Sequence, residues 1–333
     1  MGELINRRAL STQRIKELRE LLKDAERLAE SKACVYATGS LGRLETSAYS
    51  DLDLFIVGKA NGRKEADGRE GSQLNRLDEI CIKADLIDVT RKLKLPEFSG
   101  EGRYLVHYSI DDLTKTLGKP EDDVTNTFTA RLLLLLESRP LLGQEVYDDV
   151  LNDVIAPYWR DYEDHKNNFM PAFLANDILR LWRTFCVNYE AGTERIPEDK
   201  KAKGKLKNYK LKHSRMLTCY SALLFLLATF GRHQTVSPAD VVEMIHHTPT
   251  GRLEWLIKQQ DLQDARPTLE ALSGQYERFL ETTNAPEADL LRQFEDKSTS
   301  RNFMDASYKF GDLMFEALNR IGGNNRFHRL LVV

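Results

Sequence analysis

Two short apolar segments near the N-terminus limit what this chain can fold into. Ala33–Thr38 (ACVYAT) and Leu52–Val57 (LDLFIV) are each followed at once by a glycine, Gly39 and Gly58. Short apolar runs that end in glycine are typical of buried strands rather than of helices. Strands buried in this way need helices over them, so the first part of the chain is predicted to be an α/β unit.

Helical patterns surround and follow these strands. The apolar residues of Leu10–Ser31 recur at the spacing of an amphipathic helix. Cys81–Thr90 is predicted to be a third buried strand and Tyr104–Ser109 an edge strand, whereas helical patterns dominate from Asp111 onward. The predicted fold class is α+β. A mixed sheet with flanking helices is expected over residues 1–110 and an all-helical domain over residues 111–333.

Composition excludes several large classes of protein. The chain has 333 residues, of which 41% are hydrophobic and 30% charged, with a formal net charge of −3, as in ordinary globular proteins. Its most apolar stretch, Ala222–Phe230, which only Thr229 interrupts, is about half of the roughly 18 residues that cross a membrane. The charged N-terminus lacks the apolar centre of a signal peptide, so we expect a cytoplasmic protein without a membrane partner. The scattered cysteines and histidines match no common metal motif, and no P-loop or dinucleotide fingerprint occurs.

The candidate catalytic residues lie in the segment that joins the two predicted strands, within residues 38–57 (TGSLGRLETSAYSDLDLFIV). Gly39-Ser40 follows the first strand, and the pair Asp51-x-Asp53 begins the second one after ten further residues. Side chains two apart on a strand point to the same face, so both carboxylates are expected to project together. Two neighbouring carboxylates repel each other unless a cation lies between them, and Mg²⁺ is the cation that prefers such ligands.

Phosphate binding is predicted beside this pair. Gly39 lets a ligand approach the backbone closely, and backbone N–H groups and the Ser40 hydroxyl can hold phosphate oxygens. A two-metal transfer needs a third carboxylate. Asp88, near the end of the predicted third strand, is our choice, with Asp85 as the alternative.

These residues resemble the DNA polymerase β nucleotidyltransferase superfamily. Within it, GSLGRLETSAYSDLDL is most similar to the minimal nucleotidyltransferases and to the catalytic domain of bacterial PII-protein uridylyltransferases, and Ala130–Gly143 resembles the helix that follows that domain. The resemblance implies that Gly39 and Ser40 bind the triphosphate group of an NTP. It further implies that Asp51, Asp53 and Asp88 are the catalytic metal ligands for Mg²⁺ or Mn²⁺, and that Arg43 contacts phosphate or braces the loop. The chain has no His-Asp dipeptide of the uridylyltransferases' hydrolase domain, so reversal of the transfer is not expected.

Two further features leave alternatives open. Glu198–Arg215 (EDKKAKGKLKNYKLKHSR) has a net charge of +6. It is either a solvated loop or a contact for triphosphate, RNA or an acidic protein, with Lys203 and Lys205 as predicted nucleotide-binding residues. Because Tyr209 is its single aromatic residue, base stacking is poorly supported. Arg180 and Arg183 lie in an apolar helix, where they form internal ion pairs or reach the nucleotide.

The predicted function is metal-dependent transfer of an NMP from an NTP, with ATP among the candidates, to a hydroxyl group of a protein or tRNA acceptor. Pyrophosphate is the expected second product. One alternative is a synthase of cyclic or linear oligonucleotide signals, as in antiviral systems. Another is a catalytically silent nucleotide-binding protein or antitoxin-like partner. The acceptor, the base and the oligomeric state are not specified by the sequence.

Overall fold

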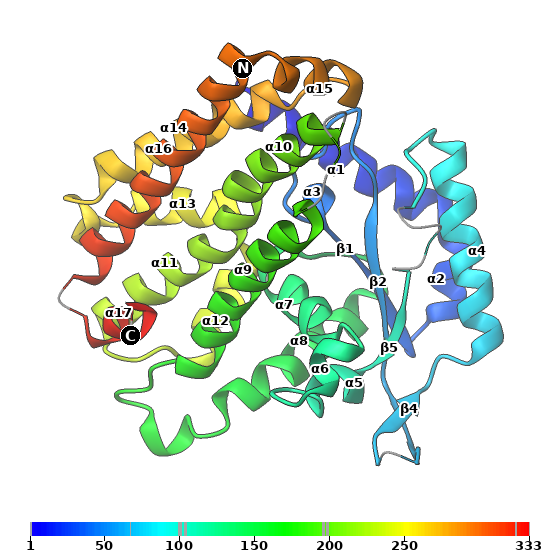
Figure 1. Ribbon diagram of the computed structural model, residues 1–333. Coiled ribbons are helices and arrows are strands. Elements are labelled where there is room, and N and C mark those ends of the chain that lie inside the picture. Colours follow the sequence, from blue (N-terminus) through cyan, green and yellow to red (C-terminus); the bar gives the residue numbers. More distant parts are fainter. Residues whose placement is uncertain are drawn as a thin grey trace. The chain divides into compact units, whose positions relative to one another are not determined.

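The computed structural model describes residues 2–66, 68–98, 102, 105–194, 197, 200–323 and 325–332 (Figure 1). The chain forms two compact units, Glu3–Arg160 and Asp161–Val333. The predicted α+β class is confirmed, with the mixed sheet in the first unit and helices in the second. The first compact unit extends to Arg160, because a late strand and two helices complete its sheet, whereas the domain boundary at residue 110 stays a prediction.

A four-stranded sheet forms the centre of the first unit, in the order β5-β2-β1-β6. The central strands β1 (Ala33–Thr38) and β2 (Asp53–Gly58) are antiparallel, and their register sets Thr38 opposite Asp53. Strand β6 (Arg139–Leu142), which the sequence did not predict, pairs with β1. Strand β5 (His107–Ser109) runs parallel to β2, and the predicted first residue of this edge strand, Tyr104, lies outside the described residues.

Helices cover both faces of this sheet (Figure 1). On one face, α1 (Glu3–Leu21), α2 (Lys23–Ala29) and α4 (Arg76–Lys92) bury leucines and isoleucines against β1 and β2. On the other, α7 (Thr127–Glu137) and α8 (Gln144–Ile155) pack on an aromatic layer that includes Tyr36 and Phe55. All six residues of β1 are buried, which explains why its sequence is apolar up to Thr38.

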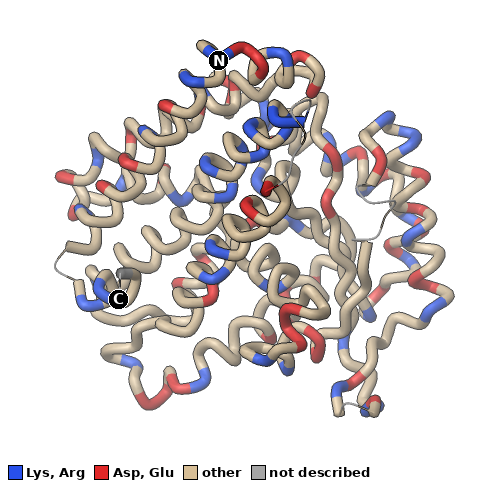
Figure 2. Tube along the Cα trace, in the orientation of Figure 1, with Lys and Arg blue, Asp and Glu red and all other residues tan. Residues whose placement is uncertain are grey.

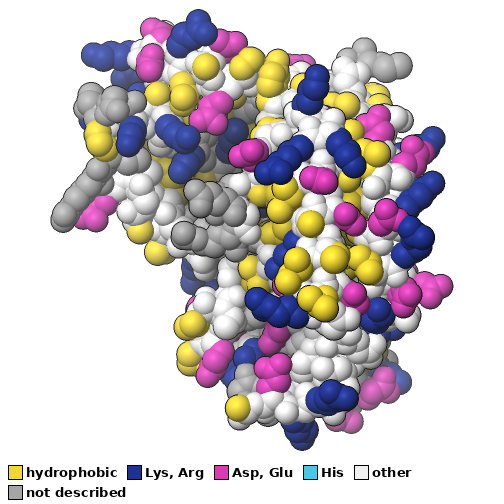
Figure 3. All heavy atoms as spheres, turned by 90° about the vertical axis from the view of Figure 1, so that its right-hand side faces the viewer, with side chains coloured by type: hydrophobic (Ala, Val, Ile, Leu, Met, Phe, Trp, Pro, Cys, Tyr) yellow, Lys and Arg dark blue, Asp and Glu magenta, His cyan; other side chains and the backbone are white. Residues whose placement is uncertain are grey.

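The prediction of a third strand over Cys81–Thr90 is wrong, because these residues lie within α4. Ile82, Leu86 and Val89 point into the core, whereas Leu77 and Ile80 on the same helix are 75% and 52% exposed. Figure 3, which views the side of the molecule that carries α4, shows hydrophobic side chains at the surface there. With apolar residues on both sides, the helix lacks the polar face that would have revealed its period.

A hairpin and an edge histidine complete the first unit. Strands β3 (Ala60–Lys64) and β4 (Glu70–Ser72) form a separate, largely exposed hairpin. His107 on β5 lies 2.9 Å from Ser72 Oγ and 3.2 Å from Glu79 on α4, so it joins three elements. Burial lowers the pKa of His107. The remaining elements are short: α3 (Gly39–Gly42), α5 (Ile110–Thr114), α6 (Glu121–Val124) and a 3₁₀ turn at Ala156–Trp159.

The described part of the second unit is helical. Helix α11 (Met216–His233) lies at its centre and packs against α9 (Ala172–Thr193), α12 (Pro238–His246) and α13 (Pro249–Ile257). A π-helical segment, Leu211–Arg215, joins α10 (Lys201–Lys210) to α11. The other helices are α14 (Arg266–Thr282), α15 (Glu287–Glu295), α16 (Lys297–Gly322) and α17 (Arg326–Val332), with short 3₁₀ turns at Glu163–His165 and Gln260–Leu262.

The continuous helix Lys201–His233 is long and apolar enough to cross a membrane by length and composition alone. However, 78% of its most apolar window is buried inside the structure. A core helix has this property, and the feature is therefore explained by packing within the second unit.

Candidate active site

Gly39 marks the point at which β1 ends and α3 begins. Its φ angle of +62° lies in the left-handed region that glycine adopts most readily. A Cβ atom built at this position would lie 2.5 Å from Oδ2 of Asp53, which is too close for any side chain. The Asp53 carboxylate therefore lies close to the Gly39 backbone, and a side chain at residue 39 would require that carboxylate or the turn to move.

The two predicted metal ligands lie where β2 begins. Asp53 is the first residue of the strand and is half-buried, whereas Asp51 precedes the strand and is exposed. Leu52 between them is buried in the core. Because alternate side chains of an extended chain point in opposite directions, both carboxylates project away from that core.

A buried ion-pair network stabilises the turn between the end of β1 and the start of β2. Arg43 Nε donates to Glu45 Oε2 and Arg43 Nη1 donates to Glu137 Oε2, each at 2.8 Å. The other carboxylate oxygen of Glu137 accepts the Gly39 N–H at 3.1 Å. All three charged residues are at most 7% exposed, so their charges are paired where solvent cannot screen them. Of the two roles considered for Arg43, these contacts favour bracing the loop.

Helix α1 holds the loop that leads from α3 to Asp51. Arg7 Nη1 donates to the carbonyl oxygen of Glu45 at 3.0 Å, and Ser11 Oγ accepts the Thr46 N–H, also at 3.0 Å. These bonds fix the loop through its backbone. The segment that carries one predicted ligand is therefore held in place before any ligand binds.

A family model covers the part of the chain that contains Gly39, Asp51 and Asp53. The model of the nucleotidyltransferase domain family matches residues 15–128. This part of the chain is a nucleotidyltransferase domain. The presence of this domain supports an enzyme that is a nucleotidyltransferase. A comparison with curated proteins finds no match. The superfamily resemblance is confirmed, and the closer likeness to PII-protein uridylyltransferases stays a prediction.

The nucleotidyltransferase domain contains the predicted residues Gly39, Ser40, Arg43, Asp51 and Asp53. They lie in or beside the segment that joins the end of β1 to the start of β2. Ser40 is half-buried in the first turn of α3. Since the Gly39 N–H already donates to Glu137, the prediction of phosphate binding depends mainly on Ser40.

The third predicted metal ligand does not lie on a strand. Asp88 is exposed on α4 and Asp85 is half-buried on the same helix. Among the residues that the structure describes, no group of three or more His, Cys, Asp or Glu side chains is arranged to hold a metal ion. The choice of Asp88 over Asp85 depended on a strand that is not present, so the structure gives it no support.

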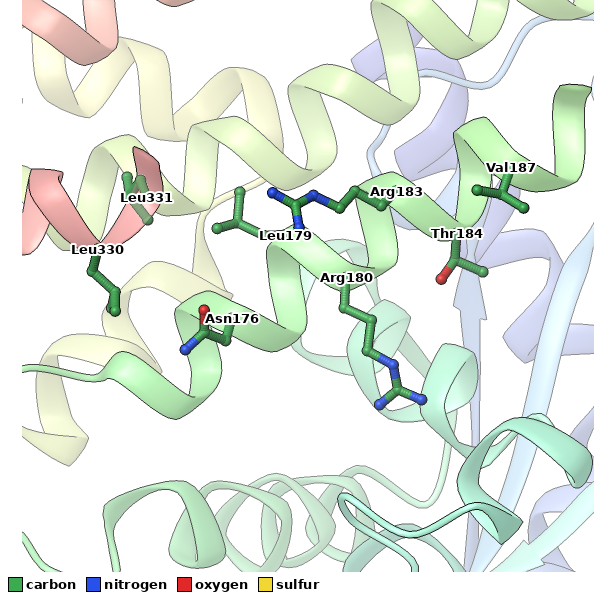
Figure 4. Close-up of a pocket in the computed structure, with 8 residues that line it drawn as sticks. All are labelled: Asn176, Leu179, Arg180, Arg183, Thr184, Val187, Leu330 and Leu331. Carbon is green, nitrogen blue, oxygen red and sulfur yellow. The ribbon is translucent and has the colours of Figure 1, made fainter. Parts of the chain in front are cut away.

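The remaining predicted residues belong to the second unit. Lys203 on α10 pairs with Glu287 at 3.1 Å, whereas Lys205 donates to the carbonyl oxygen of Phe294 at 3.3 Å. Arg180 and Arg183 on α9 line a pocket of about 390 Å³, and their guanidinium groups point in different directions (Figure 4). The Asp177 carboxylate lies 3.8 Å from Arg180, as expected for an internal ion pair.

Glu137 is the site residue that sequence reasoning missed. It ends α7, lies beyond the family match, and is brought to Gly39 only by the pairing of β6 with β1. One signal was present in the sequence: Glu137 interrupts the apolar run LLLLLESRPLL. A single carboxylate in a run that is otherwise buried needs a partner, and Arg43 is that partner.

Proposed function

We propose that this nucleotidyltransferase moves an NMP from an NTP to a hydroxyl group of a protein or RNA acceptor, with a divalent metal ion, and releases pyrophosphate. The observation that carries the proposal is the Asp53 carboxylate held against the Gly39 backbone at the end of β1. Asp51 precedes it by two residues, and a buried network stabilises the adjoining turn.

A divalent cation fits the donor set of this site. Asp51 and Asp53 offer carboxylate oxygens, the ligands that Mg²⁺ and Mn²⁺ prefer, and Asp53 fills a cradle that any Cβ at residue 39 would block. These two residues would hold the ion. When bound, it would neutralise the charge that develops on the α-phosphate during transfer.

The chain's own residues supply positioning. Ser40 presents a hydroxyl to the phosphates at the first turn of α3. Glu137 and Arg43 act as positioning residues, since they hold the Gly39 backbone on which the Asp53 carboxylate lies. In the transfer, the acceptor hydroxyl loses its proton to solvent as its oxygen bonds to the α-phosphorus, the bond from that phosphorus to the bridging oxygen breaks, and pyrophosphate leaves. Holding both reactants in line lowers the barrier because little orientational freedom remains to be lost.

The test is incubation of the purified chain with each NTP labelled in its α-phosphate, with Mg²⁺ or Mn²⁺, with and without a cell lysate. We expect label in a protein or RNA product. Asp51→Asn and Asp53→Asn should each reduce labelling at least about 100-fold, the loss typical of removing one group that stabilises transition-state charge. Asp305→Asn, an exposed aspartate on α16, is the matched control and should label normally.

Three outcomes would contradict this proposal. A small, phosphatase-resistant product formed without any acceptor would indicate an oligonucleotide synthase. NTP binding without turnover in any extract would indicate a silent nucleotide-binding protein or antitoxin-like partner. Full labelling by the Asp51→Asn/Asp53→Asn double variant would exclude this site. Asp88→Asn tests the remaining prediction, and its exposed position on α4 leads us to expect little effect.

A further inference from the structure

The basic segment of the second unit folds into α10 and the π-helical turn that follows it. The buried side of α10 carries Ala202, Leu206 and Tyr209, whereas its lysines lie on the exposed side. Figure 2 shows Lys and Arg at short intervals along this part of the chain. The segment is thus an amphipathic helix with a cationic face, not the solvated loop that was one of the two interpretations of its sequence.

A pocket of about 600 Å³ lies beside this helix and is lined by α10, the π-helical turn and the adjoining ends of α15 and α16. Four cations line it and no carboxylate does: Lys205, Lys212, Lys297 and Arg301. None of these four forms an ion pair with a carboxylate within the part of the chain that the structure describes. By contrast Lys203, which does not line the pocket, is paired with Glu287. The side chains that line the pocket therefore include four positive charges and no negative one, which favours an anionic ligand.

Four aromatic residues line the same pocket: Tyr209, Phe294, Phe303 and Tyr308. Tyr209 is 4% exposed, and its ring lies 5.8 Å from Phe294 and 5.1 Å from Phe303 between ring centroids. Tyr308 at the rim is 54% exposed, with Lys212 Nζ 4.9 Å from its centroid. The basic segment alone contains a single aromatic residue, and the fold adds three rings from α15 and α16.

We propose that this pocket binds a segment of single-stranded nucleic acid. Cations without a carboxylate partner attract the phosphate backbone, and the exposed ring of Tyr308 can stack on a base, which is the combination that single-strand binding proteins use. Exposed Lys207 and Lys210 continue the basic face of α10 beyond the pocket, so the basic surface is longer than a single nucleotide requires. An acidic polypeptide would use the cations but would leave the aromatic rim without a partner.

The proposal is independent of the transfer reaction, since the binding measurement uses neither NTP nor metal ion. The full chain is titrated into fluorescein-labelled oligouridine of about 12 nucleotides, within the range of roughly 4–16 that one such domain covers. Fluorescence anisotropy is followed at several salt concentrations. With four phosphate contacts, the logarithm of the affinity should fall with the logarithm of salt at a slope of about −3.

Matched variants locate the binding surface. Lys297→Gln should flatten that slope by about 0.7 and weaken binding, the effect of one lost phosphate contact on a single strand. Lys309→Gln, an exposed lysine on the same helix that does not line the pocket, should leave binding within twofold. Tyr308→Ala should weaken binding at least about fivefold, the lower end of base–aromatic stacking, whereas Tyr308→Phe should retain it.

Several results would overturn the proposal. These are an absence of binding by the unaltered chain, equal losses from Lys297→Gln and Lys309→Gln, or equal binding of a duplex. Competition by polyglutamate at equal charge would assign the pocket to an acidic polypeptide. Competition by a free nucleoside triphosphate at equal nucleotide concentration would assign it to a single nucleotide. Because Lys297, Lys309 and Tyr308 are exposed, their substitution should leave the unfolding midpoint unchanged, which circular dichroism checks.

Discussion

The two candidate sites use charged side chains in opposite ways. In the nucleotidyltransferase domain, Arg43 is 7% exposed and its guanidinium donates to Glu45 and Glu137. In the second unit, Lys205, Lys212, Lys297 and Arg301 are accessible around one pocket and have no carboxylate partner among the described residues. In the first arrangement the charged side chains pair with one another inside the protein. In the second they can interact with a ligand from solvent.

This difference separates two ways of building a site. A buried, paired charge fixes the backbone around it, because breaking the pair leaves an uncompensated charge in the interior. An accessible charge without a carboxylate partner does not hold the backbone in place, but it attracts oppositely charged ligands from solvent. The buried network at Gly39 is therefore expected to control geometry, and the open cations of the pocket are expected to control affinity.

The largest effect should follow from a change at the backbone that the network holds. In Gly39→Ala, the new Cβ would meet Asp53 Oδ2 at 2.5 Å while φ remains at +62°. Either the carboxylate or the turn must move, so we expect nucleotidyl transfer to fall at least about 1,000-fold, equivalent to about 4 kcal/mol of barrier. Initial rates of label transfer measure it.

Gly274→Ala is the matched control for this change. Gly274 is exposed within α14, and a Cβ built there meets nothing within 4 Å. Alanine should stabilise that helix by roughly 0.5–1 kcal/mol and leave transfer unchanged. Normal transfer by Gly39→Ala would show that the contact between Gly39 and Asp53 has no part in the reaction.

A second buried arginine of the same unit tests whether such networks matter away from the site. Arg131 is fully buried and donates to both carboxylate oxygens of Asp122, at 2.9 and 2.5 Å, and to the carbonyl oxygen of Leu113. Arg131→Met leaves the Asp122 charge without this partner. We expect the free energy of unfolding to fall by about 3–5 kcal/mol, as urea denaturation of the first unit would measure.

The control separates charge from packing. Replacing Asp122 as well, in Arg131→Met/Asp122→Leu, removes the uncompensated charge and should recover much of that stability. Transfer per folded molecule should stay near normal in both variants, in contrast to Glu137→Gln, which alters the network at Gly39. If Arg131→Met instead reduced transfer as strongly as Glu137→Gln, the two networks would not be separable.

The sequence predicted the parts of this molecule that depend on local pattern. The strands β1 and β2 lie within a few residues of their predicted ranges, and most of the described chain after Asp111 is helical, as its pattern predicted. The glycine at position 39 could be singled out because it directly follows an apolar strand. Predictions failed where a partner is distant: β6 was missed because its strand character depends on pairing with β1, about a hundred residues earlier.

The aromatic pocket shows the same limit. Tyr209 looked isolated within the basic segment, since Phe294, Phe303 and Tyr308 follow it by more than 80 residues. The prediction at α4 was wrong for a different reason: apolar residues on the exposed side of this helix concealed the helical period of its sequence. In each case the missing information is tertiary: which surface is covered, and by what.

The smallest effect concerns a buried group without a charged partner, His213 in the π-helical turn. Its Nδ1 lies 2.9 Å from the carbonyl oxygen of Tyr209, and its ring stacks on Phe279 with centroids 4.8 Å apart. Burial lowers the pKa of His213 to about 4, below its ordinary value. The folded state therefore resists protonation that the unfolded chain accepts. Stability is unaffected above about pH 6.5 and falls as the pH drops from there toward 4, by about 3 kcal/mol in total.

His213→Phe distinguishes this titration from general acid unfolding. Phenylalanine retains a ring against Phe279 and Phe310 but cannot bind a proton. Urea denaturation at pH 7, 5.5 and 4.5 should show a smaller loss of unfolding free energy for the variant than for the unaltered chain. Equal losses would mean that carboxylates elsewhere govern the acid response. A smaller loss would show that protonation of His213, whose Nε2 has no hydrogen-bond partner among the described residues, contributes to the acid destabilisation of the second unit.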